Sequence, residues 1–339
     1  MRKLKGFEKL VFIINSLMAF ALLLSYLLPY LEPKKFAFLS VLSLAVPFLI
    51  LINILFVVYW LLKVKKQLLV SLVVLAIGYS YVFSLYKFSS SKKVDDTKNL
   101  SIMNYNVRLF NVFDWIDDPD LEQNISSFIS NEKPDILCIQ EYRPDKDIDL
   151  DGYNKYEHLS GNKVKNGQAI LTKFPIINSG SIEFPNTSNN AIFADIVRGT
   201  DTIRVYNVHL QSSGIDPTVE KLAKEDSENL FNRVSSTFKI QQSQAELFLK
   251  HKSDCTYQMI ICGDFNNTAY SYVYKEIKGD LKDAFVQAGN GFGRTYDFKF
   301  FPVRIDFVLV DNAFEINAFK TFDLHYSDHY PILAKVKLQ

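Results

Sequence analysis

The sequence is poor in cysteine, with three in 339 residues: Cys138, Cys255 and Cys262. Their small number and irregular spacing exclude a disulfide framework and do not match the ligand spacing of a structural zinc site. Cys138 and Cys262 lie inside apolar runs, which indicates small buried hydrophobic residues rather than redox-active thiols. We therefore expect the fold to depend on hydrophobic burial and not on covalent or zinc cross-links.

Positive charge is scarce in the larger part of the chain. Residues 99–339 contain 25 Lys and Arg against 33 Asp and Glu, a net charge of −8, whereas residues 1–98 contain 13 against 4. Neutralisation of phosphates by Lys and Arg supplies most non-specific affinity for nucleic acid, so the acidic part is disfavoured as a general polyanion binder. A bound divalent cation would offset part of the repulsion, and nucleic acid therefore stays open as a substrate.

Long apolar runs, in contrast, are abundant near the N-terminus. The stretches 10–31, 36–62 and 68–86 contain no charged residue over 22, 27 and 19 positions. Each is long enough to cross a hydrocarbon core of roughly 30 Å as a helix, the form that satisfies backbone hydrogen bonds in lipid. A cleaved signal peptide is an alternative for the first stretch, but its length and the two stretches that follow favour a span. Pro47 leaves open a re-entrant form of the second stretch.

Basic residues in the short loops predict the orientation of these stretches. Four precede the first stretch, Lys34 and Lys35 lie between the first and second, and three lie within 63–66. With three spans, the positive-inside rule places the N-terminus in the cytoplasm and the chain after Tyr86 outside. The lysines just after the last stretch oppose this orientation; they are Lys87, Lys92, Lys93 and Lys98.

Three regions follow from this pattern. Residues 1–88 are predicted to be a transmembrane region with three helices, 89–99 a polar linker, and 100–339 a catalytic domain. We expect a multi-pass integral membrane protein whose catalytic domain is extracytoplasmic and whose N-terminal helices contact the lipid bilayer. No obligate protein partner is inferred.

Beyond the linker, strand-like and helix-like segments alternate, which predicts an α/β fold. Segments rich in β-branched and aromatic residues predict strands at 101–107, 136–140, 168–172, 202–210, 257–262, 304–310 and 332–338. Apolar spacing predicts helices over 119–131 and 228–250, the first with Asp118 as N-cap and Pro119 as first helical residue. The aromatic group 298–302 is interpreted as strand and core rather than a lipid-facing loop.

Polar residues cluster at the ends of the predicted strands. These segments are Asn-Tyr-Asn-Val-Arg at 104–108, Gln-Glu-Tyr-Arg at 140–143, Asn-Val-His at 207–209, Gly-Asp-Phe-Asn at 263–266, Arg-Ile-Asp at 304–306 and Ser-Asp-His at 327–329. Taken singly, each is weak, because a polar turn commonly follows a strand. Side chains at strand ends of stacked α/β folds converge on one crevice, so their joint occurrence predicts a single site.

In this order the segments resemble the endonuclease/exonuclease/phosphatase superfamily, which includes deoxyribonucleases, abasic-site endonucleases, neutral sphingomyelinases and inositol-polyphosphate 5-phosphatases. The resemblance spans about residues 100–338. It implies a four-layer α/β sandwich in which two mixed β-sheets pack face to face with helices outside. It also implies hydrolysis of a phosphodiester with Mg²⁺ as cofactor and Mn²⁺ as the alternative ion.

The resemblance further implies a metal site of oxygen ligands. Glu141 is the best ligand candidate, with the Asn106 amide beside it and Asp328 in support, and hard Mg²⁺ needs only one or two carboxylates. Some members carry an Asp two residues after the Asn106 position; here Arg108 stands there, which removes a ligand of a second metal site. Arg108 and Arg143 are candidates to contact a substrate phosphate, with a surface ion pair as the alternative.

The catalytic roles are implied in the same way. Asp306 matches the residue that fixes the tautomer of His329, and the pair would act as a base or cationic stabiliser near neutral pH. Asp264 would orient or deprotonate the attacking water, and the Asn266 amide would donate to a non-bridging oxygen in the transition state. His209 would lie on the phosphate or leaving-group side.

Two substrate classes stay open, with a third, non-catalytic interpretation. Asn-Val-Arg, Glu-Tyr-Arg and Ser-Asp-His-Tyr-Pro favour a deoxyribonuclease-like enzyme that cleaves nucleic acid. The apolar stretches and the net charge of −8 (25 basic against 33 acidic residues) favour a phosphodiesterase or phosphatase acting on lipid or sugar-phosphate head groups. A non-catalytic binding module is disfavoured, because every expected catalytic position is filled.

Overall fold

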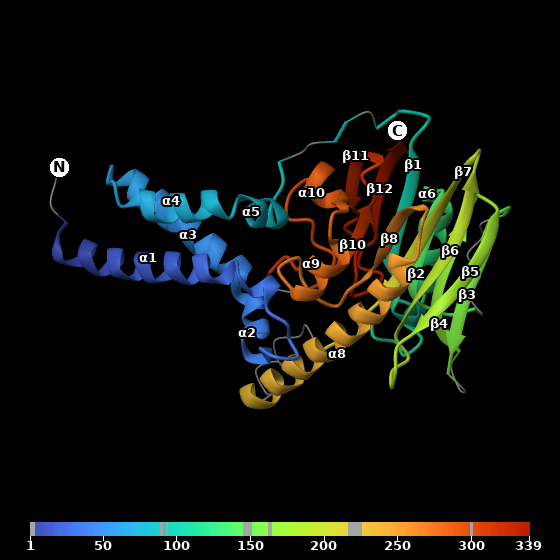
Figure 1. Ribbon diagram of the computed structural model, residues 1–339, viewed down its shortest axis with the longest axis horizontal. Coiled ribbons are helices and arrows are strands. Elements are labelled where there is room, and N and C mark those ends of the chain that lie inside the picture. The colour runs from blue at the N-terminus through green and yellow to red at the C-terminus, as the bar shows by residue number, and fades with distance from the viewer. Residues whose placement is uncertain are drawn as a thin grey trace.

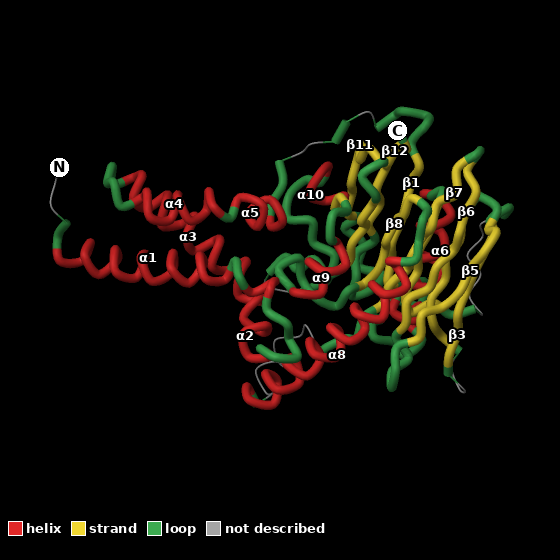
Figure 2. The backbone as a smooth tube through the Cα atoms, in the orientation of Figure 1, coloured by secondary structure: helices red, strands yellow, loops and turns green. Residues whose placement is uncertain are grey.

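The computed structural model describes residues 4–88, 91–92, 94–144, 151–161, 165–215, 226–298 and 301–339. Figure 1 shows a bundle of N-terminal helices that projects from an α/β sandwich, with α2 and α5 at the junction. Figure 2 shows the strands gathered in the sandwich and the helices confined to its outer faces and to the bundle.

Two six-stranded sheets form the sandwich, in the orders β11-β12-β1-β2-β4-β3 and β5-β6-β7-β8-β10-β9. The first sheet contains β1 (Leu100–Asn106), β2 (Ile136–Tyr142), β3 (Asn154–Ser160), β4 (Asn166–Thr172), β11 (Phe314–Thr321) and β12 (Ile332–Leu338). The second contains β5 (Ile176–Glu183), β6 (Asn190–Arg198), β7 (Asp201–His209), β8 (Gln258–Asp264), β9 (Lys282–Asp283) and β10 (Asp306–Val310). Both are mixed: β1 is parallel to β2 and antiparallel to β12, and β7 is parallel to β8 and antiparallel to β6.

Three layers of apolar contacts hold the sandwich together. Between the sheets, aliphatic residues of the first sheet such as Ile102 pack against those of the second such as Val205. Outside the first sheet lies α6 (Leu121–Glu132), and outside the second lie α8 (Ser227–Ser253) and α9 (Tyr272–Lys278). A further short helix, α10 (Ala284–Ala288), packs near β11. The expected architecture is confirmed, and Cys138 and Cys262 are buried in the central layer as expected.

Two local expectations are wrong. The helix α6 begins at Leu121 with Asp120 as N-cap, because Asp118 instead accepts a hydrogen bond from the Asp120 N–H at 3.0 Å in a turn before the helix. Phe298 and Phe301 lie in a loop rather than a strand, while residues 299 and 300 lie outside the described residues. The Phe301 ring contacts the Phe48 ring of the bundle, with centroids 4.3 Å apart, so packing between the two parts holds this aromatic loop.

The N-terminal helices correspond to the three apolar stretches. They are α1 (Gly6–Ser25) with a 3₁₀ turn at Leu28–Tyr30, then α2 (Ala37–Val41), a 3₁₀ turn at Leu42–Ala45 and α3 (Val46–Leu62), and finally α4 (Leu68–Ile77) and α5 (Tyr79–Leu85). Among the described residues, two helices, Gly6–Tyr30 and Ala37–Leu62, are long and apolar enough to cross a membrane. The third stretch is predicted to be a single helical span, but it forms two helices, α4 and α5, that meet at 83°. Together they could still form a third, broken span.

The bend lies at Gly78 and not at Pro47. A Cβ atom at Gly78 would lie 2.0 Å from Cζ of Tyr26, so the bend depends on close packing against the end of the first helix. Pro47 occupies the first turn of α3, where the missing backbone N–H leaves no intrahelical hydrogen bond unmade.

The bundle has a polar network within its otherwise apolar interior, and its outer surface is apolar. Asn15, Asn53, Ser71 and Trp60 are fully buried and form one hydrogen-bonded network. The Trp60 indole donates to Asn15 Oδ1 at 2.8 Å, and the Ser71 hydroxyl donates to Asn53 Oδ1 at 2.7 Å. Outward-facing side chains such as Leu55 are large and apolar, with 67% of Leu55 exposed. This distribution is typical of helices that pack together within lipid.

Direct contacts fix the bundle against the sandwich. The Lys34 N–H donates to Gln242 Oε1 of α8 at 2.8 Å, and the Tyr270 hydroxyl donates to the Tyr81 carbonyl at 3.2 Å. Lys87 and Gly291 exchange two backbone hydrogen bonds of 2.8 Å each. The two parts therefore meet over a specific interface and are not joined by the linker alone.

Gly263 provides a test of how tightly β7 and β8 approach each other. Its φ is +149°, and a Cβ atom there would lie 1.9 Å from the Val208 carbonyl oxygen. We expect Gly263→Ala to lower the melting temperature of the full-length protein in detergent by roughly 5–10 °C, a cost of about 2–3 kcal/mol. Gly199→Ala is the control, because its φ is +65° but nothing lies within 4 Å of the new Cβ. Equal shifts for both variants would contradict the close approach.

Candidate active site

The predicted site residues meet at one edge of the sandwich, between the two sheets. Because β1 is parallel to β2, and β7 to β8, the carboxyl ends of each pair lie side by side, with His209 opposite Asp264 in register. β10 runs antiparallel to β8, so its first residue, Asp306, also pairs with Asp264. The loop before β12 adds His329. Residues from both sheets thereby face one another.

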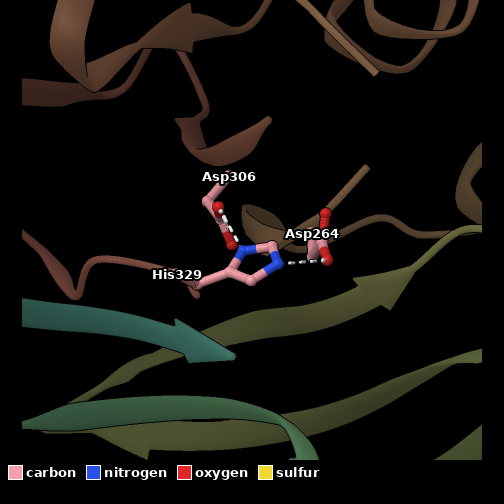
Figure 3. A group of neighbouring side chains, drawn as sticks. All are labelled: Asp264, Asp306 and His329. Carbon is pink, nitrogen blue, oxygen red and sulfur yellow. Dashed lines mark hydrogen bonds and ion pairs between the residues drawn. The ribbon is translucent and has the colours of Figure 1, made fainter. Parts of the chain in front are cut away.

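His329 lies between two carboxylates (Figure 3). Its Nδ1 is 2.9 Å from Asp306 Oδ2, and its Nε2 is 3.6 Å from Asp264 Oδ2. All three side chains are almost fully buried. Burial alone would lower the pKa of His329, but the charges of Asp306 and Asp264 outweigh it and raise the pKa to about 10. The geometry therefore maintains a buried imidazolium near neutral pH.

For Asp264, burial outweighs the attraction of the neighbouring positive charge. Burial raises the pKa of its carboxyl group to about 7, against the attraction of the charged His329. His209 approaches the same carboxylate oxygen, with Nε2 3.8 Å from Asp264 Oδ2. Burial, assisted by the charge of His329, lowers the pKa of His209 to about 3, so this imidazole is neutral. The site thus contains two histidines with opposite protonation states.

The tight turn after β8 orients Asp264. The Asn266 N–H donates to Asp264 Oδ1 at 2.7 Å, and the Asn266 side-chain amide donates to Asp264 Oδ2 at 3.1 Å. The same amide also donates to the Leu210 carbonyl at 2.9 Å. Asn266 has a φ of +49°, a left-handed conformation that asparagine adopts more readily than most residues. To donate to a substrate oxygen, this amide has to give up one of its present acceptors.

Glu141 and Asn106 lie beside this cluster. The Asn106 amide nitrogen is 3.1 Å from Glu141 Oε1 and 3.1 Å from Asp264 Oδ2. Glu141 has a φ of +52° at a register shift between β2 and β4. An extra residue of this kind re-aims a side chain at the end of a strand. The irregularity accounts for how Glu141 turns toward Asn106 while its neighbours on β2 remain in the sheet.

The donor set around Glu141 fits a hard divalent cation. Desolvation raises the pKa of Glu141, and the nearby negative charge of Asp328 raises it further. A cation near both carboxylates would remove this unfavourable charge, and carboxylate and amide oxygens are the ligands that Mg²⁺ prefers. Asn106 presents its nitrogen to Glu141 and accepts from the Arg108 N–H with its oxygen, so ligation through that oxygen requires the amide to rotate.

The two arginines expected to contact a substrate phosphate, Arg108 and Arg143, lie beside the site rather than in the His329 cluster. Arg108 Nε lies 3.3 Å from Asp328 Oδ2, and the guanidinium lies over the Trp115 ring at 4.4 Å. The ion-pair alternative therefore holds for Arg108 in this state, although 29% of its side chain is exposed. Arg143 directly follows β2, two residues after Glu141, and is partly buried.

Three buried carboxamides, Asn104, Gln140 and Asn207, belong to the polar segments that predict the site, but the sequence interpretation gave them no role. The Gln140 amide donates to Asn104 Oδ1 at 2.8 Å and to Asn207 Oδ1 at 2.5 Å, which links β1 and β2 to β7. Asn104 in turn donates to Asp306 Oδ1 at 3.4 Å. Their signal in the sequence was a polar residue inside an apolar strand, since Asn104 lies two residues before Asn106 and so shares its face.

This carboxamide chain predicts a cost for an apolar replacement. Gln140→Met preserves side-chain length but leaves buried oxygens of Asn104 and Asn207 without their donor. We expect a loss of about 2–4 kcal/mol in unfolding free energy, because each stranded polar group costs about 1–3 kcal/mol. Thermal unfolding of the full-length protein measures it, with Gln123→Met on the exposed face of α6 as the control. An unchanged melting temperature for Gln140→Met would show that the hydrogen bonds among Gln140, Asn104 and Asn207 do not help to hold the two sheets together.

A sequence profile of the endonuclease/exonuclease/phosphatase family matches residues 103–329, most of the chain. This protein belongs to the endonuclease/exonuclease/phosphatase family. The match contains every predicted site residue, and members of the family are typically phosphoester hydrolases. Residues 8–85 match a domain of unknown function. No curated protein matches the chain.

Solved structures of the family share the fold. An endonuclease/exonuclease/phosphatase from Bacteroides vulgatus is 19% identical, with a TM-score of 0.55, and the similarity covers 71% of this chain and 99% of that one. A mannosyl-6-phosphatase from Bacteroides thetaiotaomicron is 17% identical, with a TM-score of 0.53 and coverage of 70% and 99%. D. rerio TDP2 complexed with a single-strand DNA product gives the same identity, TM-score and coverage. At this identity the likeness concerns the fold alone.

Proposed function

We propose that this protein is a divalent-metal-dependent phosphodiester hydrolase with its catalytic centre at the edge between the two sheets. The observation that supports this most directly is the charged His329 held between Asp306 and Asp264, 2.9 Å and 3.6 Å away. Beside it lies the Glu141 and Asn106 pair, whose chemistry suits a hard cation. Acid–base groups and a metal site side by side are the parts that metal-dependent phosphoester hydrolysis uses.

Glu141, Asn106 and Asp328 would hold Mg²⁺, with Mn²⁺ as the alternative ion. When bound, the ion supplies polarisation of a phosphoryl oxygen and neutralisation of developing charge. Asp264, Asp306 and His329 also form a compact group, with one ligand atom of each within 4.8 Å of the others. We assign that group to proton transfer instead, because His329 Nδ1 is engaged with Asp306 and Mg²⁺ prefers oxygen ligands.

The residues of the chain then divide the reaction among them. Asp264 orients the attacking water and takes its proton, a task for which a pKa of about 7 is well matched. The water oxygen bonds to phosphorus as the bond from phosphorus to the leaving oxygen breaks. The imidazolium of His329 faces the developing negative charge, and Asn266 donates to a non-bridging oxygen. The neutral His209 donates a hydrogen bond on the leaving-group side, and the leaving oxygen takes its proton from solvent.

Single substitutions separate the metal site from the acid–base group. Glu141→Ala removes a metal ligand and His329→Ala removes a positive charge that faces the transition state, so each is expected to lower kcat by about 10²–10⁴. Glu141→Ala should also raise the Mg²⁺ concentration needed for half-maximal activity, whereas His329→Ala should not. His325→Ala is the control, because this histidine is 62% exposed and lies outside the cluster. Near-normal turnover in a folded Glu141 or His329 variant would contradict its role.

The substrate class is a separate question. The deoxyribonuclease-like candidate is favoured by the Asn-Val-Arg and Ser-Asp-His-Tyr-Pro segments. Against it stand the scarcity of basic residues and the pairing of Arg108 with Asp328 at 3.3 Å. The apolar outer surface of the bundle favours the second candidate, a phosphoester attached to lipid.

We place the bundle in a membrane as a multi-pass anchor with the catalytic domain outside the cytoplasm. Its apolar exterior and buried polar network support insertion. The 83° bend between α4 and α5 bears on the orientation, because a broken third span delivers the domain to the far side, whereas a re-entrant loop returns it to the side of the N-terminus.

A reporter fusion tests the orientation. Alkaline phosphatase fused after Asn99 is expected to be active, since it folds only outside the cytoplasm, and a fluorescent protein that requires the cytoplasm should be dark there. The same reporters fused before the first apolar stretch serve as controls and should behave in the opposite way. A dark phosphatase fusion with a bright fluorescent fusion at Asn99 would assign the catalytic domain to the cytoplasm.

A further inference from the structure

A cavity of about 310 Å³ lies where the bundle meets the sandwich. The bundle contributes one wall, formed by the start of α3 and the end of α5 and including Pro47, Phe48 and Leu85. The sandwich contributes the other wall, from loops next to the site and from Phe238 of α8. Its volume is at the lower end of the range of small-molecule pockets, large enough for part of a hydrocarbon chain.

Two residues of the cavity wall also contact the catalytic residues. Asn266 belongs to its wall, and the Asn266 amide is 3.1 Å from Asp264 Oδ2. Tyr296 belongs to the same wall, and the Tyr296 ring contacts the His329 ring edge-to-face with centroids 5.0 Å apart. The cavity therefore lies beside Asp264 and His329, with Asn266 and Tyr296 between them.

The lining selects for an apolar ligand. Aromatic and aliphatic side chains dominate it, and among the described residues that line it Arg304 is the single charged one. Arg304 Nη1 is already 2.8 Å from Asp283 Oδ2, in an ion pair buried behind the wall. A run of nucleic-acid phosphates would need several cations at this position. An apolar cavity left empty deprives its lining of contacts, which a hydrocarbon chain would restore.

We infer that the substrate is an amphiphilic phosphoester of the bilayer whose hydrocarbon chain occupies this cavity while its phosphate lies at the His329 cluster. The inference rests on the proposed hydrolase function and names its substrate class. The bundle supports the identity of the occupant: its helices form one wall of the cavity, and their outward-facing side chains are apolar, as a surface that meets lipid would be. In the reaction, water oxygen bonds to phosphorus, the bond from phosphorus to the leaving oxygen breaks, and that oxygen gains a proton.

The test uses synthetic phosphodiesters that differ only in their alkyl chain: methyl, octyl and dodecyl 4-nitrophenyl phosphate. Each releases 4-nitrophenolate, which is measured by absorbance with full-length protein in phosphatidylcholine vesicles at fixed Mg²⁺. We expect kcat/KM to rise at least tenfold from the methyl to the dodecyl ester, because each buried methylene adds severalfold in affinity.

Ser84 allows the cavity to be narrowed without touching the catalytic residues. It lines the cavity from α5, whereas Ser80, one turn earlier on the same helix, does not and is exposed. Ser84→Leu and Ser84→Trp should progressively remove the preference for the dodecyl ester while hydrolysis of the methyl ester stays within about twofold of wild type. Ser80→Leu and Ser80→Trp are the matched controls and should preserve the preference.

The outcomes distinguish a failure of the lipid-substrate inference from a failure of the proposed hydrolase function. If the methyl ester or DNA is hydrolysed with Mg²⁺ but the chain length has no effect, the hydrolase function holds and the lipid substrate is wrong. A preference for DNA over all three esters would identify a nuclease. Absence of Mg²⁺-dependent turnover of every substrate would overturn the hydrolase function itself. If Ser84→Trp disturbs folding, Ser84→Leu and a photoreactive dodecyl chain, expected to cross-link near Phe48, decide the question.

Discussion

A positive charge that is buried with its two counter-charges organises this protein. An imidazolium removed from water is stable only when carboxylates surround it, and here Asp306 lies 2.9 Å from one ring nitrogen and Asp264 3.6 Å from the other. Both carboxylates come from the second sheet, whereas His329 precedes a strand of the first. The two sheets therefore have to stack in one register for the charges to meet. The carboxamide chain through Gln140 supports that register from below.

Local irregularities at the strand ends complete the arrangement. Glu141 and Asn266 both have left-handed backbone conformations, and Gly263 approaches the Val208 carbonyl too closely for any side chain. Strained positions of this kind persist only where the surrounding structure over-determines them, and they cluster at functional sites. In this protein the left-handed conformations direct the Glu141 carboxylate and the Asn266 amide toward the site between the sheets. In a regular strand, successive side chains would instead alternate between the two faces of the sheet.

The bundle and the sandwich share more than a covalent link. The bundle exposes large apolar side chains on its outer surface and buries a polar network among apolar residues, so the two parts suit different surroundings. Yet Lys34 and Tyr81 of the bundle are hydrogen-bonded to Gln242 and Tyr270 of the sandwich. The contact encloses a cavity with Asn266 in its wall. The interface thus joins the two parts through specific side-chain contacts and not through the linker alone.

The sequence by itself determined the fold class, and it predicted the two-part organisation and the candidate site residues. Strand composition and polar strand ends are local properties, so Glu141, Asp264 and His329 could be chosen before any coordinates. Only the tertiary structure decided how they combine. The bend at Gly78, the pairing of Arg108 with Asp328 and the carboxamide chain through Gln140 all depend on residues far apart in the chain. The cavity depends on two parts meeting, and no periodicity or motif encodes a space between surfaces, because its shape arises only when distant side chains pack.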